Sequence, residues 1–213
     1  MDRLDELIAI AGPLLGRADE ILAGAGAPAT HPVHALWRRV RLTSLDAVQA
    51  VSALRPDDVA GQTPDLRAYA ARYVAAAAAL PAPQEWTGEA AQAYDATRRD
   101  LAGHLGGDAG SLAGRLAATA DLTDALLDWM RRSRSAVAAA LAEVLGSVEA
   151  VRLVVDDGAE PVGVPLVMAA ADVVQRLLDA VADCYERAAE LMDDAARQTA
   201  VAPTPGRAVH DLG

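Results

Sequence analysis

Two histidines near a predicted helix start are the first residues whose spacing could do chemistry. In His31-Pro32-Val33-His34 the imidazoles are three positions apart, a separation at which two side chains can bind one metal ion. No cysteine or carboxylate lies nearby in the sequence to complete a ligand set, and Pro32 is typical of the first turn of a helix. We therefore interpret the pair as a solvated helix start and predict no metal site.

The single cysteine and a third histidine are the remaining candidates for catalysis. Cys184 would need a basic partner to form a thiolate, and no histidine lies near it in the sequence. We expect Cys184 to be a small buried side chain and His104 to be exposed beside a run of glycines. That run, residues 103–114, lacks the Lys-Ser/Thr ending of a phosphate-binding loop. We predict no enzyme and no cofactor; an enzyme would need a polar pocket that holds one of these residues with a carboxylate.

Charged residues gather in short clusters along the chain. The acidic groups at 57–58, 156–160 and 193–194 lack the ligand spacing of a calcium loop, so we interpret them as solvated turns. Arginines cluster at 38–41, 98–99 and 131–134, each near an aromatic residue. Cation–π contacts with Trp37 and Trp129, or salt bridges to acidic helices, are one interpretation of these arginines, and a docking surface is the other.

Composition excludes several classes of partner. The chain has 213 residues, a net charge of −11 and a pI of about 4.7, which argues against nucleic acid and anionic lipid as partners. No apolar run approaches the ~20 residues that span a bilayer, and no basic-then-apolar signal peptide opens the chain. We predict a protein made in the cytoplasm without stable membrane insertion. Lys, Asn and Phe, whose codons are AT-rich, are absent, which favours a GC-rich bacterial source.

Apolar residues recur three or four positions apart and predict helices. The expected spans are 2–23 with a kink at Pro13, 32–54, 64–80, 89–155 and 165–198. The glycines at 106–110 should weaken or kink the fourth helix, because Leu101 and Leu126 keep one helical phase across them; a break at the glycines is the alternative. We expect Val148, Val151 and Val155 to continue its buried seam.

These spans predict an all-α fold, an elongated antiparallel helical bundle in which short connectors join neighbouring helices. Residues 1–56 should form an N-terminal helical hairpin and residues 57–160 a second hairpin. Residues 161–198 should form a C-terminal helix that packs on the bundle, and residues 199–213 a disordered tail.

A tryptophan turn joins the two helices of the second hairpin. In Trp86-Thr87-Gly88 the aromatic ring can fold back across the hairpin, and Gly88 allows a tight turn or a close backbone approach. Ala90 and Ala91 would leave room for the ring. This stretch is the only one that we single out as a binding surface.

The stretch from Trp86 to Tyr94 resembles the signature of the WXG family of type VII (ESX) secretion proteins. In that family a Trp-x-Gly turn joins two antiparallel helices, and the second helix commonly begins with small residues and an aromatic. Trp86 and Gly88 match the named motif, and Ala90, Ala91 and Tyr94 match the small and aromatic residues after it. The resemblance covers roughly residues 60–155, and the additional helices are similar to those of the larger PE/PPE-like substrates.

The resemblance implies a protein that acts through helix faces, as a secreted substrate or structural component of a type VII system, of the kind found in actinobacteria. Its partner would be a WXG-type helical protein, a secretion ATPase or a second copy of the chain, and export would need no cleaved signal peptide. The family's export signal, Tyr with Asp or Glu four residues later, is missing, because Tyr73, Ala77, Arg98 and Ala189 stand at those positions. The alternative function is a cytosolic chaperone or immunity-type partner of a secreted toxin.

Overall fold

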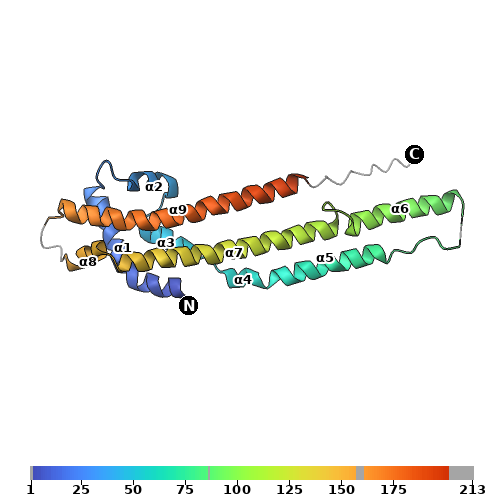
Figure 1. Cartoon of the computed structure of the whole chain (residues 1–213), viewed down its shortest axis with the longest axis horizontal. Coiled ribbons are helices and arrows are strands. Elements are labelled where there is room, and N and C mark those ends of the chain that lie inside the picture. Colours follow the sequence, from blue (N-terminus) through green and yellow to red (C-terminus); the bar gives the residue numbers. More distant parts are fainter. Residues whose placement is uncertain (1, 86, 157–160, 202–213) are drawn as a thin grey trace. The chain divides into compact units, whose positions relative to one another are not determined.

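The computed structural model describes residues 2–85, 87–156 and 161–201, and all the regular secondary structure in these ranges is helical (Figure 1). The prediction of an all-α helical bundle is confirmed. The helices are α1 (Arg3–Ala25), α2 (Val33–Val40), α3 (Ser44–Ser52), α4 (Pro56–Ala60), α5 (Gln62–Ala78), α6 (Glu89–Gly106), α7 (Leu112–Leu145), α8 (Val148–Val155) and α9 (Val164–Val201). Trp86, residues 157–160 and residues 202–213 of the predicted tail lie outside the described residues, whereas residues 199–201 belong to α9.

The chain forms two compact units that are not contiguous in sequence. Unit 1 comprises Met1–Pro56 and Asp128–Glu190, and unit 2 comprises Asp57–Leu127 and Leu191–Gly213. Both long helices, α7 and α9, contribute one part to each unit.

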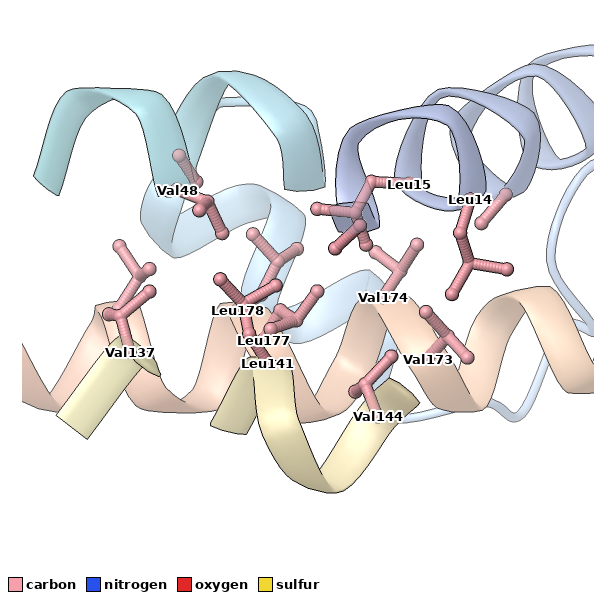
Figure 2. Packing of buried hydrophobic residues seen from close by; sticks show 14 of the residues in the cluster. Leu14, Leu15, Val48, Val137, Leu141, Val144, Val173, Val174, Leu177 and Leu178 are labelled. Atoms are coloured by element: carbon pink, nitrogen blue, oxygen red, sulfur yellow. The ribbon is translucent and has the colours of Figure 1, made fainter. Parts of the chain in front are cut away.

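Unit 1 has a dense aliphatic core. Helix α1 presents one face to it, with Leu4, Ala11 and Leu15 almost completely buried, as the spacing predicts. Pro13 lies within α1 but does not interrupt it. Figure 2 shows leucines and valines of α1, α3, α7 and α9 meeting in this core. The residues labelled there are Leu14, Leu15, Val48, Val137, Leu141, Val144, Val173, Val174, Leu177 and Leu178.

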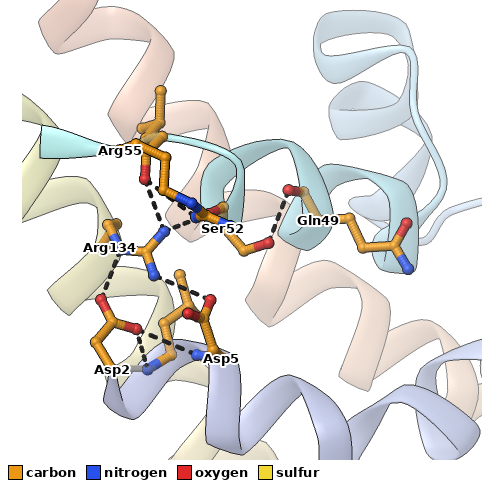
Figure 3. Close-up of polar contacts among 8 residues, drawn as sticks. Asp2, Asp5, Gln49, Ser52, Arg55 and Arg134 are labelled. Carbon is orange, nitrogen blue, oxygen red and sulfur yellow. Dashed lines mark hydrogen bonds and ion pairs between the residues drawn. The ribbon is translucent and has the colours of Figure 1, made fainter. Parts of the chain in front are cut away.

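A buried arginine ties the start of the chain to this core. Arg134 of α7 donates to Asp2 Oδ2 at 2.7 Å and to Asp5 Oδ1 at 3.0 Å, and it also binds the carbonyl oxygens of Ser52 and Leu54 (Figure 3). The bond from Arg134 lowers the pKa of the Asp2 carboxyl to about 2. One guanidinium thus connects α1 and the end of α3 to α7. In the 131–134 cluster, the salt-bridge interpretation holds for this residue.

Unit 2 buries far less. Helices α5 and α6 pack against each other and run antiparallel (Figure 1). Thr63 is the buried residue of α5 and Ala91 that of α6. Arg67 of α5 forms ion pairs with Asp121 and Asp124 of α7, at 2.9 and 2.7 Å. This pairing lowers the pKa of the Asp124 carboxyl.

Two predicted helices, 32–54 and 89–155, are interrupted at three places. The chain leaves helical geometry after Val40, where Arg41 adopts a left-handed conformation with φ of 59°. It does so again between Gly106 and Leu112, and between Leu145 and Val148. After each break the hydroxyl group of a serine or threonine accepts a hydrogen bond from a backbone N–H of the next helix. The three bonds run from Asp46 N–H to Thr43 Oγ1, from Gly114 N–H to Ser111 Oγ and from Ala150 N–H to Ser147 Oγ. The prediction of one continuous helix through the glycines is therefore wrong.

Candidate protein-binding surface

The predicted binding residues lie where α5 is followed by α6 in unit 2. The connection between these helices, residues 79–88, contains Trp86, which lies outside the described residues. Of the four other predicted residues, Ala90 and Tyr94 are exposed, whereas Ala91 is buried. The structure thus brings three small or aromatic side chains together on the first two turns of α6, directly after Gly88.

Gly88 begins α6 in a conformation that favours glycine. Its φ is 98°, in the region that side-chain-bearing residues rarely adopt, and a Cβ placed on it would meet nothing within 4 Å. Of the two roles that the sequence allowed for Gly88, the close backbone approach is therefore not the one present. The requirement is for backbone geometry, and space around Gly88 is free.

Tyr94 closes the connection through its hydroxyl group. The Tyr94 O–H donates to the carbonyl oxygen of Pro81 at 2.9 Å, and Tyr94 exposes 37% of its surface. Because Pro81 follows α5 and Tyr94 lies in the second turn of α6, this bond joins the two ends of the connection. The bond thus fixes the polar end of the Tyr94 side chain.

The close backbone approach occurs at a different glycine. A Cβ placed on Gly106 would lie 2.9 Å from Val74 Cα and 3.0 Å from Ala77 Cβ of α5, a separation that real Cβ atoms essentially never show. At its C-terminal end, α6 therefore packs directly against the backbone of α5. The alanine-rich sequence of α5 permitted such an approach, but nothing in the sequence indicated which glycine would make it.

Apolar side chains remain on the outside of these helices. Tyr69 exposes 51% of its surface, Val74 50% and Leu101 45%. Leu101, which the sequence predicts to lie on the buried seam of the helix expected at 89–155, is therefore exposed, and the buried residues of unit 2 include alanines such as Ala91, Ala113 and Ala120. Arg98 and Arg99 both bind Asp95, and the bond from Arg98 contributes most to lowering the pKa of that carboxyl.

The other candidate residues lie away from this surface or within unit 1. Cys184 is buried, and its carbonyl oxygen accepts the indole N–H of Trp129 at 2.9 Å. His31 is nearly buried, with its Nε2 3.1 Å from Asp172 Oδ1, so the prediction of a solvated helix start is wrong for His31. Within the described ranges no group of three His, Cys, Asp or Glu side chains could hold a metal ion. His104 is exposed on α6.

Sequence reasoning missed two features of unit 1. The first is the Arg134 cluster, which joins positions 2, 5, 52, 54 and 134 and gives no local signal in the sequence. The second is α8, whose valines were predicted to face the core: Val148, Val151 and Val155 expose 64%, 58% and 74% of their surfaces. The periodicity was visible, but periodicity alone does not say whether an apolar face meets the core or a partner.

None of the described helices combines the length and the apolar character needed to cross a membrane.

Comparisons with known proteins do not extend this description. No family model, no curated protein and no solved structure matches the chain.

Proposed function

We propose that this chain is a non-catalytic helical protein that binds a protein partner through the α5–α6 hairpin, as a substrate or structural component of a type VII-like secretion system. The partner would be a helical protein of WXG type or the export ATPase. The secretion system is proposed from the resemblance of the Trp86–Tyr94 stretch, and docking through helix faces is proposed from the surface of unit 2.

The docking part of the proposal rests on how few residues of α5 and α6 are buried. They are 17 and 18 residues long, yet each has one buried residue among those described. Helices in proteins are stabilised mostly by tertiary packing of an apolar face and less by the intrinsic helix propensity of their residues. A partner helix laid along this pair would cover exposed apolar side chains such as Val74 or Leu101 and supply the packing that unit 2 lacks.

Fractionation of cells and culture fluid tests the proposal. The chain is expected in the culture fluid when the host's type VII export ATPase is present and in the cells when its gene is deleted. Retention in the cells of both strains would contradict export and would favour the alternative, a cytosolic partner of a secreted toxin. Equal release from both strains would contradict the type VII route.

Two variants test whether the export machinery recognises the connection between α5 and α6. Trp86→Ala and Gly88→Val should abolish export, the first because it removes the aromatic ring from the connection and the second because valine is strained at the φ of 98°. The far-UV circular dichroism of both variants should stay helical. Gly103→Ala is the matched control, since it lies in α6 with open space around it and should be exported normally. Normal export of Trp86→Ala would exclude the tryptophan turn as the recognised feature.

A further inference from the structure

The turn that ends α2 is made by an arginine in a conformation that favours glycine. Arg41 has a φ of 59°, and its backbone N–H donates to the carbonyl oxygen of Trp37 at 3.0 Å, which closes the helix. A residue with a Cβ is strained in this left-handed region, so glycine is the commonest residue where a helix ends in this way. Glycine would make the same backbone bond without the strain. The turn alone therefore gives no reason for an arginine at this position.

The side chain of Arg41 makes no polar contact in the described part of the chain that would offset this strain. Its neighbour Arg39 pairs with Glu186 of α9. Among the described residues, by contrast, the Arg41 guanidinium has neither an ion pair nor a hydrogen bond, and it does not stack on Trp37. Strained backbone is typically kept where a side chain has a function. The guanidinium of Arg41 is therefore available to a ligand.

Arg41 lines a cleft of unit 1 that has a largely apolar wall. The cleft has a volume of about 540 Å³ and lies between α1 and the connection from α2 to α3. Its apolar residues include Leu22, which is buried, and Trp37 and Leu42, which are partly buried and pack against the core. Trp37 also contacts His34 edge to face, with the two ring centroids 5.5 Å apart. These contacts hold the indole in place, so that it forms a fixed wall of the cleft.

Three charged side chains of the described residues line the cleft, and one of them is already occupied. Asp19 accepts hydrogen bonds from the Ser44 N–H at 3.1 Å, from the Ser44 hydroxyl at 3.0 Å and from the Leu45 N–H at 3.1 Å. These bonds fix the start of α3. The carboxylate of Asp46 and the guanidinium of Arg41 pair neither with each other nor with any other described residue. One available cation and one available anion therefore line the same cleft.

We propose that this cleft binds a free α-amino acid with an aromatic side chain. The carboxylate of the ligand pairs with Arg41, its ammonium group pairs with Asp46, and its ring packs against Trp37. A zwitterion satisfies both available charges, whereas a simple anion or a simple cation leaves one of them unpaired. Sites for small molecules combine an apolar wall with a few polar groups in this way, in pockets of about 300 to 1,000 Å³. The site uses no residue of the α5–α6 hairpin, so its test is independent of any secretion role.

Nuclear magnetic resonance titration of the isotope-labelled chain with L-phenylalanine tests the site. The amide signals of Arg41 and Thr43 and the indole signal of Trp37 should shift, with a dissociation constant of about 1 mM or lower, as expected for a small ligand in an open cleft. Phenylpropanoate lacks the ammonium group and phenethylamine lacks the carboxylate, so each should bind at least about tenfold more weakly. No shift up to about 10 mM L-phenylalanine, or equally tight binding of phenylpropanoate, would overturn the proposal.

Two variants remove the charges one at a time. Arg41→Gln and Asp46→Asn should each raise the dissociation constant at least about tenfold, because each leaves one charge of the ligand unpaired. Arg38→Gln is the matched control, since Arg38 is an exposed arginine of α2 that does not line the cleft. It should bind L-phenylalanine like the wild type. Equal weakening by Arg38→Gln and Arg41→Gln would mean that net charge controls binding, and would overturn the proposed site.

Arg41→Gly separates a binding role of Arg41 from a structural one. Glycine relieves the strain at the φ of 59°, so the urea midpoint of this variant should rise above that of the wild type. Binding of L-phenylalanine should be lost together with the guanidinium. A structural role of the Arg41 side chain predicts the opposite change in stability. A midpoint that does not rise, or binding that survives in Arg41→Gly, would overturn the proposal.

Discussion

Helices of comparable length bury very different numbers of side chains in the two units. In unit 1, α1 has 23 residues and seven of them are buried, whereas in unit 2 α5 and α6 bury one described residue each. The core of unit 1 is made mainly of leucine, valine and alanine, while the close contact in unit 2 is made by Gly106 against the backbone of α5. Unit 1 is thus stabilised by apolar burial, and unit 2 by close backbone packing and ion pairs.

This difference separates the positions most sensitive to substitution from the surface at which we propose partner binding. Removing a side chain should matter most in unit 1, because a densely packed core cannot refill the space. In unit 2 the sensitive positions should be glycines and the polar contacts of Arg67. A helix pair with so few buried residues has most of its surface available, which is why we place partner binding there.

The largest expected effect is a cavity in the core of unit 1. Leu141 is completely buried, so Leu141→Ala should lower the free energy of unfolding by about 3 kcal/mol. Leu101→Ala in unit 2 removes the same atoms from a residue that is 45% exposed, and should cost less than about 1 kcal/mol. Urea unfolding followed by circular dichroism measures both. Equal losses would contradict the contrast between the units.

The second effect comes from the buried arginine of unit 1. Arg134→Met should lower the free energy of unfolding by about 2 kcal/mol, because it leaves the carboxylates of Asp2 and Asp5 and two carbonyl oxygens without their donor. Arg132→Met is the control in the same helix. Arg132 is exposed and pairs with Asp128 at 3.6 Å, so its loss should be within experimental error. A similar loss in both variants would show that burial of Arg134 does not matter.

Sequence patterns predicted the helices and the core of unit 1 well, because a helix with one buried face has a strong apolar period. The helices expected at 2–23 and 32–54 bury apolar residues such as Leu4 and Leu15 in the first span and Val33 and Val48 in the second. The pattern failed at the helix breaks, since a break of a few residues need not disturb the phase of the apolar positions. The local signal was Ser or Thr at the start of the next helix, as at Thr43, Ser111 and Ser147.

The candidate site was predicted only in its local part. Gly88 and Tyr94 could be selected because a turn glycine and a nearby aromatic are neighbours in sequence. The contacts of Gly106 with α5 and of Arg134 with Asp2 join positions 29 or more residues apart, and no local pattern indicates them. The valines of α8 were found by their period and assigned to the wrong environment, because the period of an apolar face does not show whether that face is covered.

A third prediction compares two glycines of α6. Gly106→Ala places a Cβ 2.9 Å from Val74 Cα, so α5 and α6 must separate locally, at a cost of about 1–2 kcal/mol. Gly103→Ala meets nothing within 4 Å and should stabilise α6 by up to about 1 kcal/mol. Amide hydrogen exchange of the peptides from α5 and α6 should be faster in the first variant and slower in the second. Slower exchange in both would contradict the close approach.

The smallest expected effect is the acid sensitivity that Arg134 gives to unit 1. Its bond lowers the pKa of Asp2 from 3.8 to about 2, so the folded state holds the carboxylate charged at a pH where the unfolded chain takes up a proton. The resulting stabilisation is complete above about pH 4 to 5 and is lost as the pH falls through about 2. Because the Asp2 side chain is 51% exposed, solvent screening keeps this contribution small. The difference in urea midpoint between the wild type and Arg134→Met should be constant near neutral pH and shrink between about pH 4 and 2, while Arg132→Met behaves like the wild type. A difference that persists unchanged to about pH 2 would mean that Arg134 stabilises unit 1 through its carbonyl partners alone.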